Sequence, residues 1–284
     1  MAFTEIDVKV LRERKNCVLL DCKKALTETN GDMEKAVEVL REKGLAAAAK
    51  KAGRIAAEGV VVSVIEGNVG AVLEVNAETD FVAKNASFIE FVNNVAKTII
   101  ANNPADVDAL LATKMADGQT VEEALRDKIL TIGENMKIRR FERLEGSLVS
   151  YVHGDGRIGV MVQFATDVAS KPEFEEFGRD IAMQIAAVAP QYLCEECVSA
   201  DVVAKEKEIM LVQIANDEKT KNKPQQVIDK MVEGKIKKFF KEVCLVDQQF
   251  VKDGDLTIAQ YVDNTAKALG GSIKIEKFVR FEKG

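Results

Sequence analysis

Two segments of the chain repeat one strand-then-helix pattern, and this duplication limits the possible folds more than any other feature. Residues 67–75, GNVGAVLEV, match residues 156–164, GRIGVMVQF. Downstream of each, residues 87–96, SFIEFVNNVA, match residues 173–182, EFEEFGRDIA. Each copy must pack an amphipathic helix on a sheet to bury its apolar residues. The repeat therefore predicts an α+β core of two related α/β subdomains with antiparallel sheets.

The two copies differ in the length of the loop between strand and helix. Eighteen residues separate Gly70 from Phe88, whereas fifteen separate Gly159 from Phe174. The three additional residues fall within the stretch 76–85, which contains Thr79, Asp80, Phe81 and Val82. Loops on rigid scaffolds are where function concentrates. Phe81 could pack into its own core, or it could be an exposed anchor for a partner. We expect it to be accessible to solvent in the free chain.

Upstream of the repeat, the sequence predicts a small helical domain. Three short helices over residues 4–43 are indicated by their apolar spacing, with a left-handed stop at Asn30-Gly31 and an N-cap at Asp32. We expect Gly44 to close the third helix. Such a three-helix (UBA-like) unit buries little surface, so docking is a more plausible role than chemistry. The predicted domains are an N-terminal helical domain with its linker, a first core subdomain and a second core subdomain, over residues 1–54, 55–145 and 146–284.

The core elements follow from alternation and turn residues. A hairpin is expected over 59–75 with its turn at Gly67-Asn68, and a second strand pair begins near Leu148 with its turn at 153–156. Polar helices over 199–241, broken near Asn222–Pro224, indicate a projecting helical hairpin. The other expected elements are helices over 87–100, 106–113, 121–130 and 173–187 and a last strand over 271–281.

Composition excludes several classes of protein. The chain has 284 residues, a formal net charge of −6 and one histidine, His153. A zinc site with two or three histidines is therefore impossible, and an acidic chain is poorly suited to bulk nucleic-acid binding. No run approaches the ~18 apolar residues of a membrane span, and the N-terminus lacks signal-peptide character, so we expect a cytoplasmic location. Nucleophile-elbow, Walker-type and dinucleotide-binding motifs are all missing from the sequence.

The cysteines leave one chemical alternative open. Five cysteines, an odd number spread over a long chain, favour reduced thiols over a disulfide framework. Cys194 and Cys197 have the spacing of a zinc knuckle or a redox pair, but no second pair lies at a matching distance. Inert thiols are the favoured interpretation. The alternative is an enzyme that uses these two thiols together with carboxylates.

A lysine-rich stretch provides a second alternative. Residues 219–241 contain eight lysines beside Asp229 and Glu233. A solvated helical face is the simplest interpretation. The other is an electropositive surface for an acidic protein partner or for RNA, as in an RNA-binding translation or replication factor. The net charge and the lack of clustered aromatic residues argue against RNA.

Several motifs occur in an order that resembles bacterial translation elongation factor Ts over essentially the whole chain. The most specific are DCKKAL at 21–26 and TDFVAKN at 79–85. The others are Leu11-Arg12, Gly31-Asp32, Lys50-Lys51-Ala52, Ala56-Ala57-Glu58-Gly59, Ile132-Gly-Glu-Asn135, Arg139-Arg140, His153-Gly154 and Met231-Val-Glu-Gly-Lys235.

The resemblance implies a guanine-nucleotide exchange factor for elongation factor Tu, with no covalent chemistry and no cofactor or metal of its own. It implies that Thr79–Val82 enters the partner beside its nucleotide, where Asp80 and Phe81 disturb the magnesium site. It also implies an N-terminal docking face and a C-terminal contact, formed by Arg12, Leu19, Leu20 and Lys23 and by His153, Met231 and Val232. Residues 15–20, KNCVLL, depart from the family's glycine-containing pattern, so the bend between the first two helices is expected to differ.

Overall fold

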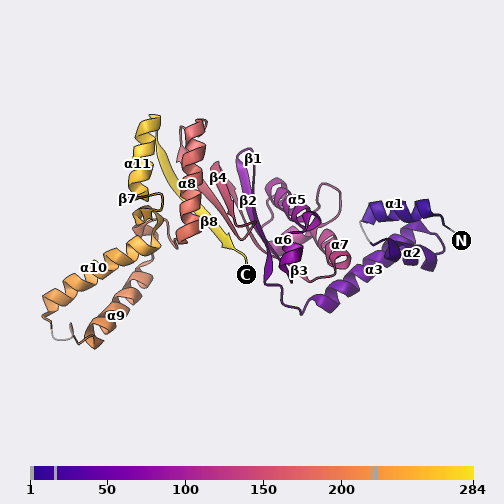
Figure 1. The fold of residues 1–284 in the computed structure, drawn as a ribbon, viewed down its shortest axis with the longest axis horizontal. Coiled ribbons are helices and arrows are strands. Elements are labelled where there is room, and N and C mark those ends of the chain that lie inside the picture. The colour runs from indigo at the N-terminus through magenta and orange to yellow at the C-terminus, as the bar shows by residue number, and fades with distance from the viewer. Residues whose placement is uncertain (1–2, 16–17, 219, 221–222) are drawn as a thin grey trace. The chain divides into compact units, whose positions relative to one another are not determined.

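A computed structural model describes residues 3–15, 18–218, 220 and 223–284 (Figure 1). The chain divides into two compact units. One comprises residues 1–144, 152–159 and 281–284, and the other comprises residues 145–151 and 160–280. The finer domain boundaries expected after residues 54 and 145 stay predictions.

The first unit begins with three helices around a small apolar core. They are α1 (Glu5–Lys15), α2 (Leu19–Glu28) and α3 (Met33–Lys51). As predicted, Asn30 and Gly31 adopt positive φ angles of 54° and 88° after α2. The carboxylate of Asp32 then caps α3 by accepting the backbone N–H of Lys35 at 3.1 Å. The buried core comprises Val8, Leu11, Cys22, Ala25, Leu26, Ala36 and Leu40.

The predicted end of the third helix at Gly44 is wrong. Helix α3 continues through this buried glycine to Lys51. A glycine in a helix interior costs about 1 kcal/mol relative to alanine. The alanine run that follows favours helix and offsets this cost, and Ala48 packs against the core of the adjoining sheet. Residues 16 and 17, in the segment that departs from the family pattern, lie outside the described residues, whereas Val18 has an extended backbone with φ −63°.

A three-stranded sheet forms the centre of the first unit. Its order is β1 (Glu58–Glu66), β2 (Val69–Ala77) and β3 (Met136–Glu145). Strands β1 and β2 are antiparallel, and Glu66 lies opposite Val69 across the predicted turn at Gly67-Asn68. Gly59 has a φ of +136°, and a Cβ at this position would lie 2.2 Å from the carbonyl oxygen of Val75. Only glycine fits so close to the neighbouring strand.

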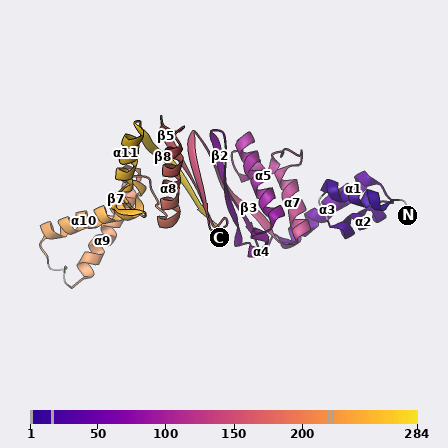
Figure 2. The ribbon, with the colours of Figure 1, turned by 45° about the horizontal axis from the view of Figure 1, so that its top comes forward.

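Helices cover one face of this sheet. Both views place α5 (Ala86–Asn102) and α7 (Val121–Ile132) on the same side of β2 and β3 (Figures 1 and 2). The short α6 (Val107–Ala112) precedes α7, whose capping box joins Thr120 and Glu123. The backbone N–H of Thr120 lowers the pKa of the Glu123 carboxyl. Apolar side chains of α5 at helical spacing, Phe88, Val92, Val95 and Ile99, are buried in one cluster with those of β1 and β2.

The sequence analysis did not identify strand β3, because charged residues fill most of its positions. Only Met136, Ile138 and Leu144 are buried on it. Two of its charged residues are explained by Glu74, a fully buried carboxylate on β2. Arg139 and Arg140 pair with Glu74 at 3.2 and 2.7 Å. A buried charge needs such partners, and this pairing between distant segments is not visible as a local pattern.

Most of the second copy of the repeat lies in the second unit. The corresponding sheet has the order β4 (Ser147–His153), β5 (Ile158–Thr166) and β8 (Ile273–Glu282). Helix α8 (Pro172–Val188) packs on it, with the Phe164 and Phe174 ring centroids 5.2 Å apart. The predicted α+β class with two related subdomains is confirmed. Three elements that we did not predict complete this unit: β6 (Gln249–Phe250), β7 (Asp253–Thr257) and α11 (Ile258–Leu269).

The predicted helical hairpin is also present. Helices α9 (Ala200–Asn216) and α10 (Gln225–Val243) lie side by side in both views (Figures 1 and 2). Pro224 occupies the N-cap position of α10, whereas Asn222, at the expected break, lies outside the described residues. The two helices share a narrow buried seam formed by Met210, Ile214, Val232 and Ile236.

The expectation of reduced thiols is wrong for one pair. Cys194 and Cys197 form a disulfide across the 3₁₀ turn η1 (Glu195–Cys197). This turn brings their Cα atoms to 5.3 Å, within the range that a disulfide spans. Cys22 and Cys244 are buried free thiols, and burial raises the pKa of Cys244 to about 11. Cys17 lies outside the described residues.

Candidate functional site

The extended loop of the first repeat forms a short helix that exposes an aromatic ring. Strand β2 ends at Ala77, and after two residues the chain forms α4 (Asp80–Ala83). Val82 and Ala83 are buried, and Val82 belongs to the core of the sheet. Phe81, between Asp80 and Val82, is 83% exposed. The structure confirms that Phe81 is accessible in the free chain, and core packing of this residue is excluded.

Two glutamates hold the entrance to α4. The backbone N–H and the hydroxyl of Thr79 donate to the Glu134 carboxylate at 3.0 and 2.7 Å. In return, the backbone N–H of Asn135 donates to the Glu78 carboxylate at 2.6 Å. The residues 78, 79, 134 and 135 are called the α4 clamp below. The sequence analysis gave no role to Glu78, Glu134 or Asn135, and the only available signal was the motif at 132–135.

The remaining polar group of α4 lies in solvent. The Asp80 carboxylate pairs with the Lys84 ammonium at 3.2 Å, and both side chains are more than half exposed. An exposed pair at this helical spacing contributes little to stability, typically about 0.3–0.5 kcal/mol. Asp80 is therefore held only weakly, and its carboxylate can exchange Lys84 for another cation.

The predicted N-terminal docking residues lie on one small helical domain. Leu19 and Leu20 begin α2 with exposed fractions of 54% and 58%, and Arg12 and Lys23 are exposed as well. Cys22 and Leu26, on the same helix, point into the domain core. Helix α2 therefore separates an inner apolar face from exposed leucines, which is the arrangement of a surface that a partner can cover.

The predicted C-terminal residues are not equivalent. His153 is exposed at the end of β4, beside the turn that leads to β5. On α10, Met231 is half-buried against the seam of the hairpin, whereas Val232 is only 8% exposed and lies inside it. Met231 offers surface to a partner, and Val232 supports the hairpin from within.

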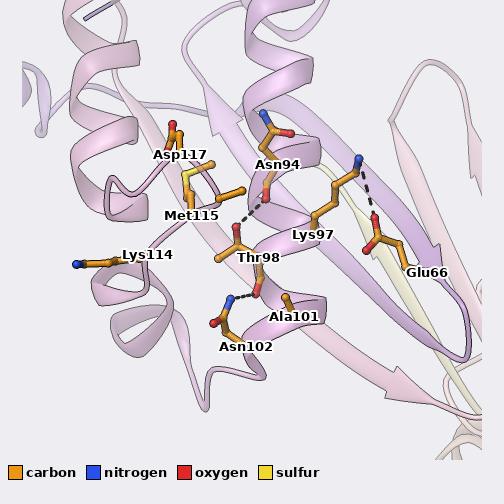
Figure 3. Close-up of a pocket in the computed structure, with 10 residues that line it drawn as sticks. Glu66, Asn94, Lys97, Thr98, Ala101, Asn102, Lys114, Met115 and Asp117 are labelled. Carbon is orange, nitrogen blue, oxygen red and sulfur yellow. Dashed lines mark hydrogen bonds and ion pairs between the residues drawn. The ribbon is translucent and has the colours of Figure 1, made fainter. Parts of the chain in front are cut away.

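Metal chemistry has no candidate site in the described part of the chain. Its His, Cys, Asp and Glu residues form no cluster that could hold a metal ion. A surface hollow of about 410 Å³ lies beside α5 (Figure 3). Lys97 faces Glu66 there at 3.9 Å, and the Thr98 hydroxyl donates to the carbonyl oxygen of Asn94 at 2.8 Å. These polar groups interact with one another.

Comparison with known proteins decides the family. The profile described as "Elongation factor TS" matches residues 78–284. The chain belongs to the elongation factor Ts family. Elongation factor Ts of Clostridium perfringens is 53% identical over 282 residues, covering 98% of this chain and 91% of the relative. The protein of that name from Clostridium botulinum strain Eklund 17B is 51% identical and that from Clostridium kluyveri 49% identical, with the same coverage.

Family membership connects this chain to the elongation phase of protein synthesis. The matched region includes α4, Glu134 and the helical hairpin, so the exposed phenylalanine and its clamp lie inside the family's domain. Among the helices that the structure describes, none combines the length and the apolar character needed to cross a membrane.

Proposed function

We propose that this chain is a guanine-nucleotide exchange factor that binds elongation factor Tu and promotes release of GDP. The single observation that supports this most is Phe81, a large apolar ring presented to solvent on a helix that Val82 anchors in the core. In the proposal, Thr79–Val82 enters the partner beside its nucleotide. Asp80 and Phe81 then disturb the magnesium site there.

The energetics are compatible with this role. Magnesium bridges the phosphates of a bound nucleotide and the protein, so displacing it weakens nucleotide binding. Burying one phenylalanine supplies about 1.5–3 kcal/mol, which is roughly one to two powers of ten in an equilibrium constant. Phe81 alone is therefore insufficient, and separate docking surfaces must hold α4 in place. If this chain binds the nucleotide-free partner more tightly than the nucleotide-bound partner, linkage requires that it lower the partner's nucleotide affinity by the same factor. This effect has no preference for GTP over GDP.

The docking surfaces of the proposal come from the family resemblance, and the exposure of most of their residues supports it. Leu19 and Leu20, flanked by Arg12 and Lys23, would contact the partner from the N-terminal domain. His153 and Met231 would form the second contact, and Val232 would keep α10 in position beneath it. The proposed activity requires no covalent step, no cofactor and no nucleic acid, and it would take place in the cytoplasm, with both GDP-bound and nucleotide-free partner as targets.

Replacing Met231 with alanine is expected to slow nucleotide exchange without unfolding the chain. Met231 is half-buried at the edge of the hairpin seam, so its outer surface is available to the partner. Val232→Ala is the matched control, because it removes methyl groups from the seam itself and should lower the melting temperature. GDP release and a melting curve are measured for each variant. A lowered melting temperature with unchanged exchange for Met231→Ala would place Met231 in the core.

The proposed function is tested with purified elongation factor Tu loaded with a fluorescent GDP. Mixing it with this chain in a stopped-flow instrument should accelerate release of the labelled nucleotide, and the rate should saturate as the chain concentration rises. A pull-down of elongation factor Tu from a bacterial lysate provides independent evidence of binding. Retention of the partner without any acceleration would reject the exchange activity and leave only binding.

A further inference from the structure

The α4 clamp connects the exposed helix to a distant part of the chain. Glu134 accepts two hydrogen bonds from Thr79, at 3.0 and 2.7 Å, and Glu78 accepts one from the backbone of Asn135 at 2.6 Å. The bonds run in both directions between residues 78–79 and 134–135. Hydrogen bonds to a charged carboxylate are shorter and roughly twice as strong as neutral ones. The clamp is therefore a stiff connection.

The far side of the clamp is itself held in place. Gly133 ends α7 with a φ of +89°, and its N–H donates to the carbonyl oxygen of Ile129 at 3.0 Å. Asn135 is only 9% exposed, and its side-chain amide donates to the carbonyl oxygen of Arg54 at 2.8 Å. Glu134 lies between these two fixed points. Its carboxylate can therefore orient Thr79, and does not simply follow that residue.

Helix α4 needs such a support. It has four residues, and a helix of this length does not define its own direction. Burial of Val82 and Ala83 anchors the C-terminal half of α4, whereas Asp80 and Phe81 at its start are exposed. The Thr79 hydroxyl makes no capping bond to α4 and donates to Glu134. The residue at the N-cap position therefore makes a long-range hydrogen bond and no local capping bond.

We propose that Glu134 and Glu78 are positioning residues that hold α4 so that Phe81 points toward the partner's nucleotide site. This inference deepens the proposed exchange function and rests on it. Positioning matters because an aromatic ring acts on a metal site only when it enters from one direction, and misplacement by about 1 Å can cost as much as 10²-fold in rate. The clamp glutamates themselves do not touch the nucleotide.

The first test separates rate from affinity. Stopped-flow release of fluorescent GDP from elongation factor Tu is measured against increasing concentrations of Glu134→Ala. We expect the saturating rate to fall roughly fivefold, whereas the concentration for half-maximal effect stays near that of the parent, because the docking surfaces are untouched. Glu134→Gln retains a hydrogen-bond acceptor, so its saturating rate should lie between those of the parent and Glu134→Ala. Glu122→Ala serves as the control, because Glu122 is an exposed glutamate on α7 that pairs with the nearby Arg126.

The second test uses the double variant. If Glu134 acts through Phe81, then Glu134→Ala should have no further effect on exchange in a Phe81→Ala background. If the two substitutions instead reduce the exchange rate independently, so that their fold-losses multiply in the double variant, the proposal is overturned. A parent-like rate for Phe81→Ala would instead contradict the role of α4 in exchange itself. If Phe81→Ala slows exchange and Glu134→Ala exchanges at the parent rate, the role of α4 in exchange stands and only the positioning role of the clamp is rejected.

The third test needs no partner. The chain contains no tryptophan, so Phe81→Trp introduces a single fluorescent reporter at the tip of α4. Time-resolved anisotropy should show greater local motion of this tryptophan when Glu134 is replaced by alanine or glutamine, and no change for Glu122→Ala. Identical local motion in all variants would overturn the proposal, even where Glu134→Ala lowers the melting temperature.

Discussion

Replacing Phe81 with alanine is expected to slow GDP release from elongation factor Tu by roughly an order of magnitude or more, in line with the ~1.5–3 kcal/mol that burying a phenylalanine contributes. The folding of the chain should be nearly unchanged, because the ring is 83% exposed and makes little contact with the core. Binding to nucleotide-free partner should fall less, since the docking surfaces carry much of the affinity. Stopped-flow release of fluorescent GDP and a melting curve measure the two effects.

The matched control for this variant is Phe88→Ala. Phe88 lies one turn into α5 and is fully buried in the core of the first sheet, so its truncation should cost about 3–5 kcal/mol of stability. Asp80→Ala, beside Phe81, should show a smaller exchange defect of the same kind. A Phe81→Ala variant that melts far below the parent but exchanges normally would contradict the proposed mechanism.

Replacing Leu20 with aspartate is expected to weaken association with elongation factor Tu by about 2 kcal/mol or more, which is roughly thirtyfold in affinity. Leu20 is 58% exposed at the start of α2, so the free chain tolerates a charge there. In the complex, the same charge would be buried in an apolar contact without a partner. Titration calorimetry with nucleotide-free elongation factor Tu measures the loss.

Asp21→Ala provides the contrast on the neighbouring residue. Asp21 lies in the first turn of α2, where a carboxylate stabilises the helix by about 0.3–1 kcal/mol. Its removal should lower the melting temperature more than the affinity. Equal losses of affinity for Leu20→Asp and Asp21→Ala would contradict this division of roles and extend the docking contact to both positions.

The structure of α10 gives less support to the alternative in which the lysine-rich stretch 219–241 binds RNA. Lys238 pairs with Glu242 at 3.8 Å, and Lys235 donates to the side-chain oxygen of Gln213 at 3.4 Å. These two lysines of the stretch 219–241 are therefore paired with an acidic and an amide side chain from outside it. Lys219 and Lys221 lie outside the described residues. A gel shift with RNA at several salt concentrations distinguishes this alternative, because phosphate contacts make binding strongly salt-dependent.

Local patterns determined much of the fold from the sequence. The stop at Asn30-Gly31, the cap at Asp32 and the turn at Gly67-Asn68 were all predicted and all occur. Each depends on residues within one turn of the chain, where a left-handed glycine or a capping carboxylate has a direct conformational effect. The repeat extended these local signals to two related subdomains, because the same apolar spacing must bury the same kind of helix on the same kind of sheet.

Other features differed from what the local sequence pattern indicated. Gly44 looked like a helix end, yet α3 continues through it in a run of alanines. Strand β3 carries Arg139 and Arg140, which pair with the buried Glu74 on β2. The Cys194–Cys197 disulfide required the local turn that brings the two Cα atoms within reach. In each case, the composition of the segment pointed to a different structure.

The candidate site likewise combines features that the sequence predicted with features that only the tertiary structure shows. The sequence by itself determined that the first repeat has an extended loop, that Phe81 lies in it and that its motifs belong to the elongation factor Ts family. Only the tertiary structure decided that Phe81 faces solvent while its neighbour Val82 is buried, and that Glu134 accepts both donors of Thr79. The physical reason is that burial and charge-assisted hydrogen bonds depend on which surfaces meet in space, and residues 79 and 134 meet only after α5, α6 and α7 have folded between them.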